Sequence, residues 1–63
     1  MKATYQVICQ DRKTSKVMSQ ATERMNVPDL SAGDFPNFER KGPNLLERRL
    51  VRAAEVITER IRF

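Results

Sequence analysis

The chain has no histidine, no tryptophan and a single cysteine, Cys9, and these shortages exclude most catalytic and metal chemistry. Histidine is the usual general base near neutral pH, and zinc sites need several histidine or cysteine ligands. One cysteine cannot form an intramolecular disulfide, and it fits a reducing compartment. The sequence therefore predicts a protein that is not an enzyme, with no catalytic residues, no metal and no cofactor.

Glycine and long apolar runs are also scarce. The two glycines, Gly33 and Gly42, stand in a proline-containing segment and form no phosphate-binding loop. No apolar run approaches the roughly 20 residues that a membrane span needs, and the first residues lack a signal-peptide pattern. We therefore expect a cytoplasmic protein without a membrane partner.

The length of 63 residues predicts one small domain, residues 1–63, with marginal stability on its own. Small domains usually add disulfides, a metal or a second subunit. Because the first two are excluded here, the composition favours self-association, and we predict a homodimer.

The net charge of +4 invites a nucleic-acid interpretation, but the charges are spread along the chain. Residues 1–30 and residues 43–63 each hold five basic and three acidic side chains, and residues 31–42 hold two of each. Because phosphate-binding proteins usually show a stripe of one sign, this even distribution argues against a dedicated phosphate-binding surface.

The N-terminal part predicts a β-hairpin over about residues 3–22. Residues 3–9 alternate, so that Ala3, Tyr5, Val7 and Cys9 share one face. Residues 10–15 are polar and predict a turn, although no glycine is present there. Residues 16–22 fit either a returning strand or a helix capped by Thr14 or Ser15, and the polar turn favours the strand.

The C-terminal part predicts an amphipathic helix over about residues 44–62. Asn44 is a suitable N-cap, and Glu47 stands where a capping box places a carboxylate. On a helical wheel one stripe has the width of a core-facing surface. It consists of Leu46, Leu50, Ala53, Ala54, Ile57 and Ile61.

A long connection, about residues 27–43, precedes this helix and contains both glycines and all three prolines. Phe35 and Phe38 in this connection are expected to anchor it to the core, or to form an exposed recognition element. A weaker helix stripe, formed by Leu45, Val56 and Phe63, suggests a second neighbour, either this connection or a partner helix. The candidate protein-binding residues are therefore Leu45, Val56, Phe63, Phe35 and Phe38.

The densest basic run lies at the predicted hairpin turn. Arg12, Lys13 and Lys16 are candidate nucleic-acid contacts there, because flexible basic tips can bind phosphates. The alternative is an ordinary polar turn, since no aromatic side chain accompanies these charges as a base-stacking platform would require.

Together these patterns predict an α+β fold: an N-terminal hairpin, a long loop and one C-terminal helix. The alternative is a strand-helix-loop-helix chain that dimerises in a ribbon-helix-helix-like arrangement. The functional hypothesis is a non-enzymatic accessory or regulatory protein that binds another protein and self-associates. The alternative hypothesis is a small basic nucleic-acid-binding regulator.

Overall fold

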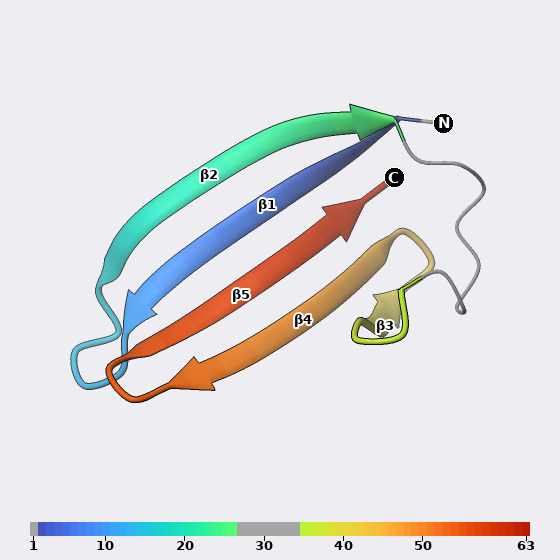
Figure 1. Ribbon diagram of the computed structural model, residues 1–63. Helices are drawn as coiled ribbons and strands as arrows, with labels where there is room; N and C mark the ends of the chain where they lie inside the picture. Colours follow the sequence, from blue (N-terminus) through green and yellow to red (C-terminus); the bar gives the residue numbers. More distant parts are fainter. Residues whose placement is uncertain (1, 27–34) are drawn as a thin grey trace.

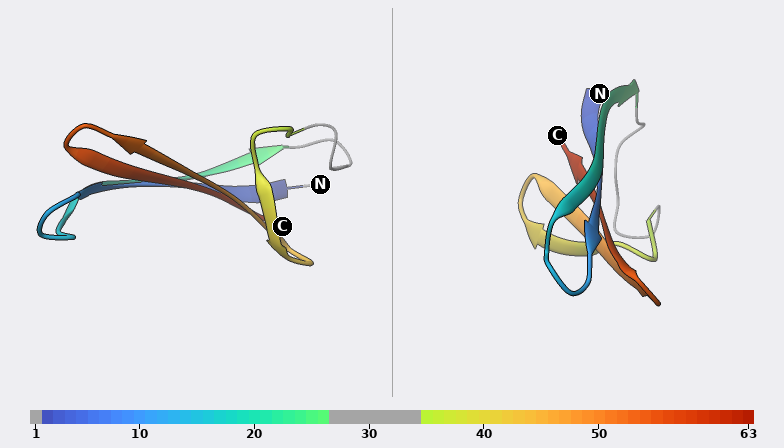
Figure 2. Two further views of the ribbon diagram at one scale, coloured as in Figure 1. Left: turned by 90° about the horizontal axis from the view of Figure 1, so that it is seen from below. Right: turned by 90° about the vertical axis from the view of Figure 1, so that its left-hand side faces the viewer.

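The computed structural model describes residues 2–26 and 35–63, and the regular structure in this part is entirely β-strand. The five strands form one antiparallel sheet in the order β2-β1-β5-β4-β3 (Figure 1). They are β1 (Lys2–Asp11), β2 (Val17–Asn26), β3 (Glu39–Gly42), β4 (Leu45–Arg52) and β5 (Glu55–Arg62). Figure 2 shows the sheet as a single, strongly twisted layer.

The predicted helix over residues 44–62 is wrong, because this segment forms the antiparallel hairpin β4–β5. Ala53 and Ala54, which the helical wheel placed in the core, form the exposed turn of the hairpin. The predicted α+β class is therefore wrong, and the described part of the chain is all β. The ribbon-helix-helix alternative fails for the same reason, since the described residues contain no helix.

Complementary residue pairs explain the preference for a hairpin. Residues at equal distances from the Ala53–Ala54 turn face each other across the ladder. The pairs are Leu45–Arg62, Leu46–Ile61, Glu47–Arg60, Arg48–Glu59, Arg49–Thr58, Leu50–Ile57, Val51–Val56 and Arg52–Glu55. Six of these eight pairs join opposite charges or two apolar side chains. Such pairs stabilise a sheet by roughly 0.2–1 kcal/mol each.

A helix would lose this complementarity. It would place Arg48 one turn from Arg52, and Glu55 one turn from Glu59, and like charges at this spacing destabilise a helix. The β-branched residues that cluster in β5 also favour an extended backbone. The charge pattern and the local propensity of this segment thus agree on the hairpin.

The predicted N-terminal hairpin is present, with β1 paired to β2 from Lys2–Asn26 to Gln10–Val17. Residues 17–22 therefore belong to a strand, which the sequence favoured over a helix. This strand continues to Asn26, beyond residue 22, where the predicted hairpin ends. The other side of β1 pairs with β5 along its length. This pairing joins the two hairpins into one sheet and makes β1 and β5 its central strands.

The predicted connection over residues 27–43 contains the short edge strand β3, which pairs with β4. The earlier part of that connection, residues 27–34, lies outside the described residues. The predicted long loop is therefore wrong at its C-terminal end.

The core lies where the neighbouring strands β1, β5 and β4 adjoin. Ala3, Leu46 and Ile61 are buried on β1, β4 and β5. The rings of Phe35 and Phe38 meet edge to face, with their centroids 5.8 Å apart. Four aromatic residues pack against the buried cluster: Tyr5, Phe35, Phe38 and Phe63. Phe35 and Phe38 therefore anchor their segment to the core, which was the first of their two expected roles.

The turn between β1 and β2 is held by side-chain bonds and contains one strained residue. The backbone N–H groups of Lys13 and Thr14 donate to Asp11 Oδ1 at 2.8 and 3.0 Å. These bonds, that from Thr14 foremost, hold the pKa of Asp11 below its ordinary value of 3.8. Ser15 has a φ of 59°, in the left-handed region that glycine adopts without strain.

We expect Ser15→Gly to raise the free energy of unfolding by up to about 1 kcal/mol. The left-handed conformation costs a residue with a Cβ about 1–2 kcal/mol, and the greater freedom of glycine in the unfolded chain offsets part of the gain. Urea unfolding followed by circular dichroism measures the difference. The matched change Ser19→Gly, inside β2, is expected to lower stability by about 0.5–1 kcal/mol. Equal shifts in the two variants would show that φ at Ser15 is not the cause.

Candidate functional site

The strand register sorts the side chains onto two faces, because directly paired residues project to the same side of a sheet. We call one side the apolar face, defined on β1 by Ala3, Tyr5, Val7 and Cys9. On the neighbouring strands this face carries Ile57, Glu59 and Ile61 of β5, Leu46, Arg48 and Leu50 of β4, and Ala21, Glu23 and Met25 of β2.

The apolar face is covered at one end and open at the other. Phe35 and Phe38 pack over its Ala3 end. At the other end the two long hairpins form a single layer, and no other described strand lies over them (Figure 2). Four adjacent apolar side chains remain partly exposed there, and we call them the apolar patch: Val7, Cys9, Leu50 and Ile57.

A polar cluster lies in the same cross-strand row as Val7, between the covered end and the patch residues Leu50 and Ile57. Arg48 Nη2 donates to Glu59 Oε2, and the guanidinium carbon of Arg48 lies 5.2 Å from the ring centroid of Phe38. Burial, and then the negative charge of Glu59, raise the pKa of Tyr5. Arg48 Nε is buried without an acceptor among the described residues. Arg48 is therefore held in place by its charge partner and by the ring of Phe38.

Charged residues also border the patch on its other side. Glu55 pairs across the ladders with both Asp11 and Arg52, between the patch and the two turns. The patch thus has an apolar centre with charges of both signs at its two ends. This arrangement is typical of protein interfaces, which combine an apolar core with a polar rim.

The predicted protein-binding residues do not form one surface. Leu45 and Val56 lie on the face opposite the apolar patch, and the register separates them to opposite ends of the β4–β5 hairpin. Phe35, Phe38 and Phe63 pack against the core. The second stripe is lost because it depended on a helical period, whereas a strand alternates every two residues.

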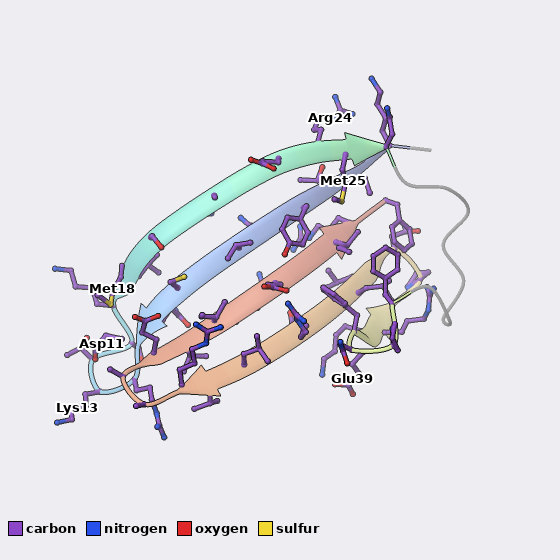
Figure 3. The ribbon with its side chains drawn as sticks, viewed as in Figure 1. Asp11, Lys13, Met18, Arg24, Met25 and Glu39 are labelled. Atoms are coloured by element: carbon purple, nitrogen blue, oxygen red, sulfur yellow. The ribbon has the colours of Figure 1, made fainter. Side chains whose placement is uncertain are left out.

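The predicted nucleic-acid-binding residues stay together and are exposed at the β1–β2 turn. Figure 3 labels Lys13 at this end of the sheet, beside Asp11. Arg12, however, joins this turn to the neighbouring β4–β5 turn. Its N–H donates to the carbonyl oxygen of Ala54 at 3.3 Å, and its guanidinium donates to that of Arg52 at 3.5 Å. Of the three predicted residues, Lys13 and Lys16 form no hydrogen bond to the β4–β5 turn among the described residues.

The apolar patch was not predicted as a site, although Leu50 and Ile57 were expected to face the core and Val7 and Cys9 to share one face of a strand. The sequence pattern predicted a strand for Val7 and Cys9 and a helix for Leu50 and Ile57. The signal that could have united them is the mirrored charge pattern about Ala53–Ala54. That pattern predicts a hairpin, and a hairpin places Leu50 opposite Ile57.

Within residues 2–26 and 35–63, no three histidine, cysteine, aspartate or glutamate side chains gather as a metal site would require. The same residues include no helix with the length and apolar character to cross a membrane. Comparison with protein-family models, with curated proteins and with solved structures finds no match. The two faces of the sheet are therefore the basis for a functional assignment.

Proposed function

We propose that this protein is a non-enzymatic accessory protein that acts by protein binding, and that it forms a homodimer through the apolar patch. The observation that carries the proposal is the partial exposure of the four patch residues on neighbouring strands. A sheet with an apolar face is stable when a second layer covers that face. The described part of the chain supplies no second layer at this end (Figure 2).

The small size of the buried core supports an open face. Among the described residues only Ala3, Leu46 and Ile61 form a buried apolar core. Covering the patch would enlarge the buried apolar area of this single sheet. Each Å² of apolar surface removed from water stabilises the folded state by roughly 25 cal/mol.

A second copy of the chain is the occupant that this surface favours. In a two-fold dimer the same patch of both subunits meets, and two sheets stack about 10 Å apart. The Arg48–Glu59 ion pair borders one end of the patch, and the cross-strand neighbours Arg52 and Glu55 border the other. Because both ends offer both signs, opposite charges of the two copies can meet at the rim.

Leu50 and Val51 provide a matched test, because they are adjacent in β4 and project to opposite faces. We expect Leu50→Glu to convert the dimer into a folded monomer, since it would place a carboxylate without a partner in the apolar interface. Val51 is 60% exposed on the other face, and Val51→Glu is expected to leave the dimer intact. Sedimentation velocity measures the mass, and circular dichroism shows that each variant is folded.

Two outcomes would contradict the proposal. One is a wild-type protein that remains at the mass of a single chain at concentrations on the order of 100 µM, where dimers with micromolar Kd are populated. The other is dissociation by both variants alike, which would assign the effect to added negative charge rather than to the patch.

A further inference from the structure

The pleat of the sheet concentrates positive charge on the face opposite the apolar patch. Along the sequence the charges are evenly distributed, but alternate residues of a strand project to opposite sides. We call this side the basic face. On the four longer strands its basic residues are Lys2 of β1, Arg24 of β2, Arg49 of β4, and Arg60 and Arg62 of β5. Its acidic residues, within the described strands, are Glu39 and Glu47.

The two acidic residues of the basic face already have partners. Glu47 Oε2 accepts a bond from Arg60 Nε at 2.9 Å, and Glu39 pairs with Lys41 at 3.1 Å. Four basic residues are exposed and form no ion pair within the described part of the chain: Lys2, Arg24, Arg49 and Arg62. Within residues 2–26 and 35–63, the basic face therefore carries uncompensated positive charge.

Three of these residues surround Thr4. Arg24 and Arg62 are its direct neighbours on β2 and β5, and Lys2 is the preceding residue on the same face of β1. Figure 3 shows Arg24 and Met25 leaving the end of β2 on opposite sides. With strands about 5 Å apart and alternate residues about 7 Å apart, Arg24 and Arg62 are separated by roughly 10 Å at the backbone.

Arg49 extends the positive charge along the sheet. Arg49 stands four residues after Leu45 on the same face of β4, and Leu45 pairs directly with Arg62. The four basic residues thus cover roughly 20 Å along the strands. One strand of a duplex places a phosphate every 3.4 Å or so along its axis, so several phosphates fit this length.

We propose that the basic face binds nucleic acid through its backbone phosphates, with Lys2, Arg24, Arg49 and Arg62 as the contacts. Hydroxyl and amide groups lie between these cations, on Thr4, Gln6 and Thr22. Such groups donate to phosphate oxygens alongside arginine and lysine. The aromatic residues of the described part all pack against the core on the other side. The basic face has no stacking platform, and binding is therefore independent of base sequence.

This site is independent of the proposed dimer. No described strand covers the basic face (Figure 2), and stacking of two patches would leave one basic face on each outer side. The site also differs from the predicted basic turn, since Lys13 and Lys16 lie at the opposite end of β1 from Lys2.

The test is fluorescence anisotropy of a labelled 20-base-pair duplex, titrated with protein at several salt concentrations. Four phosphate contacts predict a slope of log K against log salt of about −3 to −4, or roughly a 100-fold loss of affinity between 50 and 200 mM salt. In Arg24→Ser/Arg62→Ser the slope should fall in magnitude by about 2, so that the loss is roughly 10-fold. Arg24→Lys/Arg62→Lys should keep the wild-type slope, because lysine retains the charge.

The matched control is Lys13→Ser/Lys16→Ser, which removes the same net charge at the turn and should change the slope by less than about 1. Equal losses in the two serine variants would overturn the assignment to the basic face. The proposal would also be overturned by absence of binding at 50 mM salt, or by binding to vesicles of anionic lipid without binding to the duplex.

Discussion

Ile61→Ala is expected to lower the free energy of unfolding by about 2–5 kcal/mol. Ile61 is only 1% exposed, lies on the central strand β5 and forms the buried cluster together with Ala3 and Leu46. Truncation removes buried methyl groups and leaves a cavity that the surrounding rings of the core fill incompletely. Because small domains have only about 5 kcal/mol or somewhat more of total stability, the variant should be largely unfolded at 37 °C.

Thermal and urea unfolding of the variant and of Val51→Ala measure this difference. Val51 is 60% exposed, so its truncation should cost less than about 0.5 kcal/mol. Thr58 cannot serve as a neutral control. It is only 7% exposed, in the middle of β5. Similar melting temperatures for Ile61→Ala and Val51→Ala would contradict the assignment of the core to the apolar face.

Glu59→Ala is expected to lower the free energy of unfolding by about 1–3 kcal/mol, because it leaves the Arg48 charge on the apolar face without its partner. The two side chains are 29% and 13% exposed, so solvent screens part of the loss. The double variant Arg48→Met/Glu59→Leu should recover most of the stability, since similar apolar side chains remove both charges together.

The ion pair between Glu47 and Arg60 offers a comparison on the opposite face, with side-chain exposures of 20% and 33%. We expect Glu47→Ala to cost less than about 1 kcal/mol, because Arg60 lies on the polar side of the sheet and can be hydrated. Urea unfolding of the single and double variants provides the measurement. A loss in Glu47→Ala as large as that in Glu59→Ala would show that the apolar surroundings of Arg48 are unimportant.

The proposed sites lie on opposite faces of one sheet, and the alternation of strand residues separates them. The apolar patch lies toward the turn end of one face, with Cys9, Ile57 and Leu50 in one cross-strand row. The basic cluster around Thr4 is near the other end, on the other face. A protein–protein contact and a nucleic-acid contact can therefore form at the same time on one small chain.

Much of the N-terminal half was predictable because its signals are local. The alternation in residues 3–9 and the polar segment after them indicated a hairpin, and β1 and β2 form one. The absence of glycine from the turn also had a structural counterpart, because Ser15 takes the left-handed conformation that glycine would favour. These features depend on neighbouring residues, which a sequence pattern records directly.

The C-terminal half was mispredicted because its apolar spacing fits two structures. Leu46 and Leu50 are four residues apart, as are Ile57 and Ile61. A spacing of four gives one turn of a helix and also two alternations of a strand, so these residues share a face in both. The mirrored charges about Ala53–Ala54 distinguish the two structures, but only when the segment is read outward from a turn.

By itself, the sequence indicated the N-terminal hairpin and the absence of histidine, since both follow from residue types and their near neighbours. Only the tertiary structure decided that β5 pairs with β1, that Leu50 meets Ile57 beside Cys9, and that Arg24 and Arg62 flank Thr4. The physical reason is that pairing between distant strands selects which residues share a face. The evenly spread charges and the separated apolar runs therefore became two distinct surfaces only when the sheet formed.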